Sequence, residues 1–129
     1  MKVIMLKGPH SCGKTTVLNL VYDMLVDTHG AAVKKHKSPL GGNKKDFEAV
    51  LDYNGTTVAI YTMGDYSCAV TDAMQKYASC NADVLIIACN DRFKRPLTAI
   101  KKYPNAIIQK TKNTQSKDEG KANEIIAKI

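Results

Sequence analysis

Residues 8–15 read Gly-Pro-His-Ser-Cys-Gly-Lys-Thr and match the pattern G-x-x-x-x-G-K-[ST]. Glycines at these positions permit a backbone whose successive N–H groups turn inward and hold phosphate oxygens. The Lys14 ammonium can reach the β- and γ-phosphates of a nucleotide, and the Thr15 hydroxyl can bind Mg²⁺. The residue types and their spacing therefore predict a phosphate-binding loop.

The segments on either side of this loop have the patterns that such chemistry needs. Lys2 to Leu6 is a short apolar run of the kind buried on both faces of a sheet. A helix is expected from about residue 14 to residue 28, and its positive end would face the same phosphates. The residues expected to bind the nucleotide are Gly8, Pro9, His10, Ser11, Cys12, Gly13, Lys14, Thr15 and Thr16.

Strand and helix patterns alternate along the rest of the chain. The expected elements are a strand at 31–37, a hairpin at 46–62, a helix at 66–79, a strand at 83–89, a short helix before Pro104, a strand at 106–111 and a helix from 116. Asn54-Gly55 is a strong hairpin signal, because both residues accept a positive φ. This order predicts one domain, residues 1–129, with an α/β fold. We expect a three-layer α/β/α sandwich whose sheet is mostly parallel with one antiparallel hairpin.

On the residues of the 8–15 segment, the chain resembles the P-loop nucleoside triphosphate hydrolases and kinases. The resemblance extends over nearly the whole chain through the order of its elements, and residues 8–15 carry its specific motif. It implies the P-loop NTPase fold and the binding of ATP or GTP with Mg²⁺. Lys14 is then expected to act in catalysis as well as in binding. The resemblance leaves the reaction open.

Proteins of this superfamily usually position Mg²⁺ with an aspartate at the end of a neighbouring buried strand. Asp65, which follows the apolar strand at 58–62, is expected to serve the metal together with Thr15 and to take part in catalysis. Asp65 is also placed to cap the helix at 66–79, and both roles can hold together. Asp91, directly after the strand at 83–89, is the other candidate, either as a base toward a second substrate or as a loop residue.

A basic run, Asp-Arg-Phe-Lys-Arg, follows the strand at 83–89. Small-molecule kinases of the superfamily carry an arginine-bearing lid at a comparable place. By this resemblance Arg92 and Arg95 are expected to stabilise the transferring phosphoryl group, the alternative being a solvated basic loop. Only residues 38–46 separate the second strand from the hairpin, too few for a helical substrate-binding insert. An atypical small kinase or an ATP hydrolase is therefore favoured, with an unknown small-molecule or protein acceptor.

Two other functions stay open. The hairpin and the glycine-containing loop after it resemble the paired strands and switch loop of GTPases, and residues 33–37 resemble a segment of the accessory GTPases of molybdenum-cofactor maturation. Residues 111–114 lack the aspartate that would bind the guanine edge, and the DxxG signature is missing, which favours ATP over GTP. A non-catalytic nucleotide-binding module is the third possibility, since no residue is assigned to activate water.

The formal charge of +7 points to an anionic partner. Aromatic residues are rarely interleaved with the lysines, so we expect nucleotide phosphates and a solvated face rather than nucleic acid. The lysines concerned are Lys34, Lys35, Lys37, Lys44, Lys45, Lys101, Lys102, Lys110 and Lys112. No apolar stretch is long enough for a membrane span, and the four cysteines show no paired spacing. We therefore expect a cytoplasmic protein with reduced thiols and no membrane partner. The oligomeric state stays open.

Overall fold

A computed structural model describes residues 1–40, 45–111 and 115–129 of the chain, without the side chains of residues 115 and 116. Its strands are β1 (Lys2–Gly8), β2 (Ala32–Pro39), β3 (Phe47–Tyr53), β4 (Thr56–Tyr61), β5 (Val84–Asn90) and β6 (Asn105–Gln109). Its helices are α1 (Lys14–Asp23), the π-helical turn η1 (Met24–Thr28), α2 (Ser67–Ser79), α3 (Arg95–Ile100) and α4 (Gln115–Ala127). Within the described ranges, no helix is both long and apolar enough to cross a bilayer.

All six strands form one mixed sheet in the order β2-β3-β4-β5-β1-β6. The neighbours β4-β5, β5-β1 and β1-β6 pair in parallel, as expected. The expectation of a single antiparallel pair is wrong, because β2 also pairs antiparallel with β3. Only residues 40–46 join these two strands, and a parallel pair would need a crossover of a dozen residues or more.

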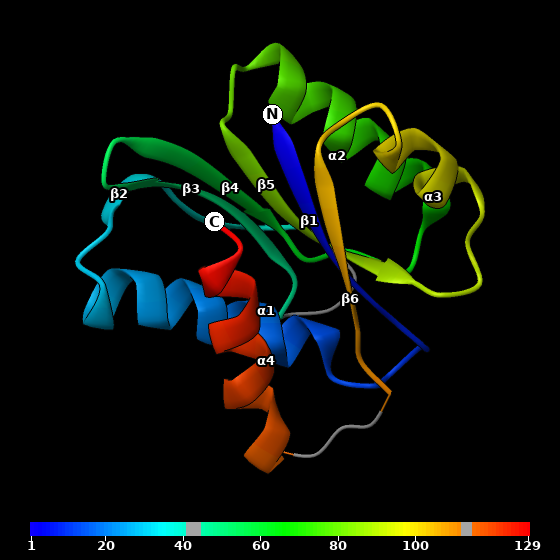
Figure 1. Cartoon of the computed structure of the whole chain (residues 1–129), viewed down its shortest axis with the longest axis horizontal. Coiled ribbons are helices and arrows are strands. Elements are labelled where there is room, and N and C mark those ends of the chain that lie inside the picture. Colours follow the sequence, from blue (N-terminus) through cyan, green and yellow to red (C-terminus); the bar gives the residue numbers. More distant parts are fainter. Residues whose placement is uncertain (41–44, 112–114) are drawn as a thin grey trace.

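Helices cover both faces of the sheet (Figure 1): α1 and α4 lie on one side, and α2 and α3 lie on the other. The side chains of successive β1 residues point alternately into the two hydrophobic cores. Ile4 and Leu6 pack with the α1 and α4 side, and Val3 and Met5 pack with the α2 and α3 side. This confirms the prediction that β1 is buried on both faces and that the chain has an α/β architecture.

The hairpin of β3 and β4 turns at Asn54 and Gly55, whose φ values are +53° and +84°. Its register is one-for-one from Tyr53 opposite Thr56 to Glu48 opposite Tyr61, so the predicted hairpin is confirmed. The start of β3 therefore returns to the carboxyl end of β4. There the Phe47 N–H donates to Thr62 Oγ1 (2.9 Å), and the Thr62 N–H donates to the Phe47 carbonyl (3.1 Å).

Lys110, expected among the solvated or phosphate-binding lysines, is instead buried beneath the start of the 8–15 segment. Its Nζ lies 2.7 Å from Asp118 Oδ1, and the two side chains are 2% and 1% exposed. Its N–H donates to the Lys7 carbonyl (2.8 Å), and a Cβ on Gly8 would lie only 2.4 Å from the Lys110 carbonyl oxygen. The expectation fails because β6 pairs with β1, which brings the residue after β6 against the end of β1 and under α4.

Candidate functional site

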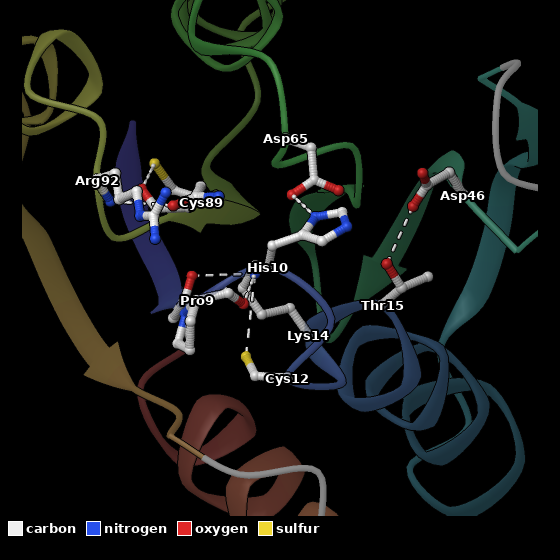
Figure 2. Close-up of polar contacts among 11 residues, drawn as sticks. Pro9, His10, Cys12, Lys14, Thr15, Asp46, Asp65, Cys89 and Arg92 are labelled. Carbon is white, nitrogen blue, oxygen red and sulfur yellow. Dashed lines mark hydrogen bonds and ion pairs between the residues drawn. The ribbon is translucent and has the colours of Figure 1, made fainter.

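The 8–15 loop, which joins β1 to α1, folds around the side chain of Lys14 (Figure 2). Ser11 and Gly13 have φ values of +59° and +93°, so two left-handed residues turn the loop back on itself. Lys14 is 6% exposed, and its ammonium donates to the carbonyls of Gly8 (3.1 Å) and Pro9 (2.8 Å). The loop thus surrounds a buried positive charge.

A cavity of about 400 Å³ opens beside this loop. That volume lies within the range of ordinary small-molecule sites. The cavity lies between the loop with the first turn of α1 and the segment that follows β4. Its lining residues are His10, Ser11, Gly13, Lys14, Thr15, Thr16, Lys45, Thr62, Gly64 and Asp65. Of the nine residues expected to bind nucleotide, Gly8, Pro9 and Cys12 do not line the cavity but shape the loop around Lys14.

Asp46 joins two hydroxyl groups at this cavity, a role the sequence interpretation missed. Its Oδ1 accepts from Thr15 Oγ1 at 3.0 Å and from Thr62 Oγ1 at 2.9 Å. Figure 2 shows the Asp46 carboxylate facing Thr15. Oxygen atoms of the 8–15 loop, of the residue before β3 and of the residue after β4 therefore gather at one point. A second hollow of about 330 Å³ lies against Asp46, lined by Asn19, Lys37, Pro39, Lys45, Asp46 and Phe47.

Asp65 faces the loop and does not cap α2. The N-cap of α2 is Tyr66, without a side-chain capping hydrogen bond, so the capping alternative is wrong. The Asp65 carboxylate instead lies 3.2 Å from His10 Nδ1. Gly64 permits this course, because a Cβ there would come within 2.7 Å of the Ala88 backbone. The segment after β4 therefore lies directly against β5, and Asp65 reaches the cavity.

The other predicted residues lie farther from the Lys14 side chain. The Asp91 N–H donates to the Gly8 carbonyl (3.0 Å), which puts Asp91 beside the first residue of the loop. Arg92 and Arg95 are exposed, and neither lines the cavity. Figure 2 shows Arg92 on the side of the loop away from Asp46, and Arg95 Nη1 lies 3.8 Å from Cys68 Sγ. The structure does not bring the two arginines together with Lys14.

Two titratable groups near the site have shifted pKa values. Burial raises the pKa of the Cys89 thiol to about 11, although the ammonium groups of Lys14 and Lys7 oppose the shift. Cys89 is therefore a neutral thiol at pH 7. Burial alone would raise the pKa of Glu48, but its hydrogen bonds with Lys76 and Lys35 and its charge interaction with Lys76 lower the pKa below the ordinary value. Glu48 is thus a carboxylate paired with Lys76 at 2.6 Å, and it does not line the cavity.

The donor atoms at the cavity suit one mode of metal binding. Within the described ranges, no group of three or more histidine, cysteine, aspartate or glutamate side chains could hold a metal ion. Mg²⁺, however, is usually held by one or two carboxylates together with waters and the phosphates of a substrate. Thr15 and Asp46 supply a hydroxyl and a carboxylate next to the cavity, which fits that mode.

Residues 112–114, which belong to the segment compared with a guanine reader, lie outside the described residues. The described geometry therefore concerns the 8–15 loop and the cavity beside it. Comparison of the chain with protein-family models, with curated proteins and with solved structures gave no match.

Proposed function

We propose that the chain is a P-loop nucleoside triphosphate-binding protein with the P-loop NTPase fold, which binds Mg·ATP and transfers or hydrolyses its γ-phosphoryl group. The observation that carries this proposal is the 8–15 loop, curved around the buried Lys14 ammonium and open to the adjacent cavity. The loop runs from a buried parallel strand into the N-terminus of α1, where backbone N–H groups and the helix dipole favour anions. The proposal includes a cytosolic location, in keeping with the four free thiols of the structure.

In this proposal the Lys14 ammonium gives up its hydrogen bonds to the carbonyls of Gly8 and Pro9 and donates to phosphate oxygens when a nucleotide binds. Before binding, those two carbonyls hold the ammonium inside the loop, so the charge is already in place when a nucleotide arrives. The desolvated position strengthens its interaction with the phosphates. Thr15 and Asp46 are the residues that would hold Mg²⁺, and the bound ion would neutralise charge on the phosphates.

In this proposal the carboxylate that would hold Mg²⁺ is that of Asp46 and not that of Asp65. Asp46 Oδ1 lies 3.0 Å from the hydroxyl of Thr15, whereas the Asp65 carboxylate is paired with His10. Thr62 also donates to Asp46, so the carboxylate is held between two elements of the fold. A carboxylate anchored in this way is oriented before a metal arrives.

Asp46→Asn is expected to lower the affinity for ATP in the presence of Mg²⁺ by about tenfold or more. The reason is that a neutral amide replaces the carboxylate that would hold the ion. Binding of ATP in EDTA should not weaken, because without the ion the Asp46 carboxylate repels the phosphates and does not hold them. Titration calorimetry in both conditions measures the two affinities. Asp65→Asn is the matched control, since Asp65 lines the cavity next to which Asp46 lies and the substitution makes the same charge change. Loss of the Mg²⁺ effect in Asp65→Asn with an unchanged effect in Asp46→Asn contradicts the assignment.

A thermal-shift series with ATP, GTP, ADP and GDP, each with and without Mg²⁺, tests the proposed function. A ligand at 100 times its Kd stabilises the folded state by about 2.7 kcal/mol. For a domain of this size we expect a rise in Tm of several degrees, largest for ATP with Mg²⁺. Equal or larger shifts with GTP and GDP would support the GTPase-like alternative, and binding without phosphate release would support a non-catalytic module. No shift with any nucleotide contradicts the proposal.

A further inference from the structure

We propose that His10 and Asp65 form a proton-accepting dyad, in which His10 takes the proton of the water that attacks the γ-phosphorus. This inference rests on the proposed function. It assigns a base, which the pattern of residues alone did not supply.

The dyad joins two separate elements across one cavity. His10 belongs to the loop after β1, Asp65 belongs to the segment after β4, and Nδ1 and Oδ1 lie 3.2 Å apart. Both residues line the cavity that Lys14 and Thr15 also line. Figure 2 shows the imidazole ring next to Asp65 with its second nitrogen turned away from the carboxylate.

The pairing has a chemical consequence for the second ring nitrogen. A neutral imidazole has one donor and one acceptor nitrogen, and the hydrogen bond of one nitrogen sets the state of the other. We place the proton of neutral His10 on Nδ1, which lies 3.2 Å from Asp65 Oδ1, and this leaves the lone pair on Nε2. The carboxylate then orients the ring and stabilises the imidazolium that forms when Nε2 takes a proton.

The contribution of this pair to folding is small. The side chains of His10 and Asp65 are 71% and 45% exposed, and ion pairs this open to solvent add little to stability. The pair therefore adds little to the stability of the fold, whereas its position at the cavity allows it to act on a bound molecule.

The other described groups at or near the site are less suited to accept a proton. Asp46 already accepts from two hydroxyls, and Lys14 is an ammonium that donates to carbonyls. Cys89 is a neutral thiol, and Glu48 is paired with Lys76 outside the cavity lining. Among the titratable side chains described as lining the cavity, His10 alone carries an imidazole, the side chain that most often accepts a proton in catalysis.

In the proposed step, the water oxygen forms a bond to the γ-phosphorus, and the bond from that phosphorus to the β–γ bridging oxygen breaks. ADP leaves with the electron pair, inorganic phosphate forms, and the water proton passes to Nε2 of His10. Solvent then removes the proton from the imidazolium and restores the neutral ring.

Two variants of His10 separate this role from a structural one. His10→Asn keeps a side-chain donor near the Nδ1 position but has no base, and it should lower kcat for ATP hydrolysis about 100-fold. Its Kd for a non-hydrolysable ATP analogue with Mg²⁺ should stay within about threefold of wild type. His10→Gln places its amide near the Nε2 position and should be equally slow, because an amide cannot take the proton.

An imidazole ¹⁵N spectrum of the free protein supplies a readout that needs no nucleotide. The chain has three histidines, so His29 and His36 serve as internal references. We expect the Nδ1–H tautomer for neutral His10 in wild type and a different tautomer balance in Asp65→Asn, with the other two histidines unchanged. An Nε2–H tautomer in wild type overturns the dyad.

The outcomes distinguish this inference from the function on which it rests. Wild-type protein that binds no Mg·ATP overturns the proposed function and the dyad with it. Wild-type protein that hydrolyses ATP while His10→Asn turns over at the same rate overturns the dyad alone. Wild-type protein that binds Mg·ATP without hydrolysis likewise overturns the dyad and leaves nucleotide binding standing.

Discussion

Replacing Lys14 with alanine is expected to lower the affinity for Mg·ATP at least about 100-fold, because charge-assisted hydrogen bonds to phosphate in a desolvated site contribute roughly 1.5–3 kcal/mol each. Lys14 is 6% exposed, its ammonium is held by the carbonyls of Gly8 and Pro9, and the 8–15 loop has no second lysine to replace it. Titration calorimetry measures the affinity. Circular dichroism reports whether the fold is kept.

Lys101→Ala is the matched control, because it removes the same charge from an exposed position at the end of α3. Its affinity for Mg·ATP should equal that of wild type within about twofold, apart from a weak effect of net charge. Lys14→Ala that still binds Mg·ATP within threefold of wild type would exclude the loop as the phosphate site.

Lys110→Met is expected to destabilise the protein by about 3–5 kcal/mol, which is the usual cost of removing one partner of a buried ion pair. Asp118 is 1% exposed, and its Oδ2 already has no hydrogen-bond partner among the described residues. Without the Lys110 ammonium, the Asp118 carboxylate on α4 would stay buried without its ion-pair partner. Urea denaturation monitored by circular dichroism measures the change in the free energy of unfolding.

The double variant Lys110→Met with Asp118→Leu provides the control for that prediction. It removes both charges together and should regain most of the stability that the single variant loses, since apolar replacement of a buried pair is often neutral. A single variant that loses less than about 1 kcal/mol would show that the pair is not needed to hold α4 against the sheet.

The elements that could be predicted from the sequence are those with a strong local signal. The apolar run of β1, the helix that follows it and the Asn54-Gly55 turn each have one physical interpretation, and each was confirmed. The pairing of β2 lacks such a signal, because β2 is mostly exposed and its residues do not alternate between two faces. The short connection of residues 40–46 excludes a parallel crossover, and this length, which the prediction of a single antiparallel pair did not use, indicates the antiparallel pairing of β2 with β3.

Asp46 shows how a site residue can be deduced from a hairpin. The two-residue turn sets a one-for-one register, and extending that register past Glu48 and Tyr61 brings Asp46 beside the end of β4. Because β4 runs parallel to β5 and β1, that end lies at the same edge of the sheet as the 8–15 loop. The hydrogen bonds with Thr15 and Thr62 follow from this placement.

The pair of Lys110 and Asp118 could not be predicted in the same way. Both residue types are normally exposed, and their burial depends on how α4 packs over the end of β6. Arg92 and Arg95 likewise carry no local signal that distinguishes a lid from a solvated loop, and both are exposed in the structure. Their part in phosphoryl transfer stays a prediction.

The central claim is that the 8–15 loop binds a triphosphate. The most direct measurement is a ¹H–¹⁵N correlation spectrum of the protein during titration with Mg²⁺ and a non-hydrolysable ATP analogue. We expect the largest shifts at the backbone amides of residues 10, 11 and 13–16 and of Gly64 and Asp65, which line the cavity. Shifts confined to other parts of the chain, or no shifts at millimolar analogue, would contradict the account.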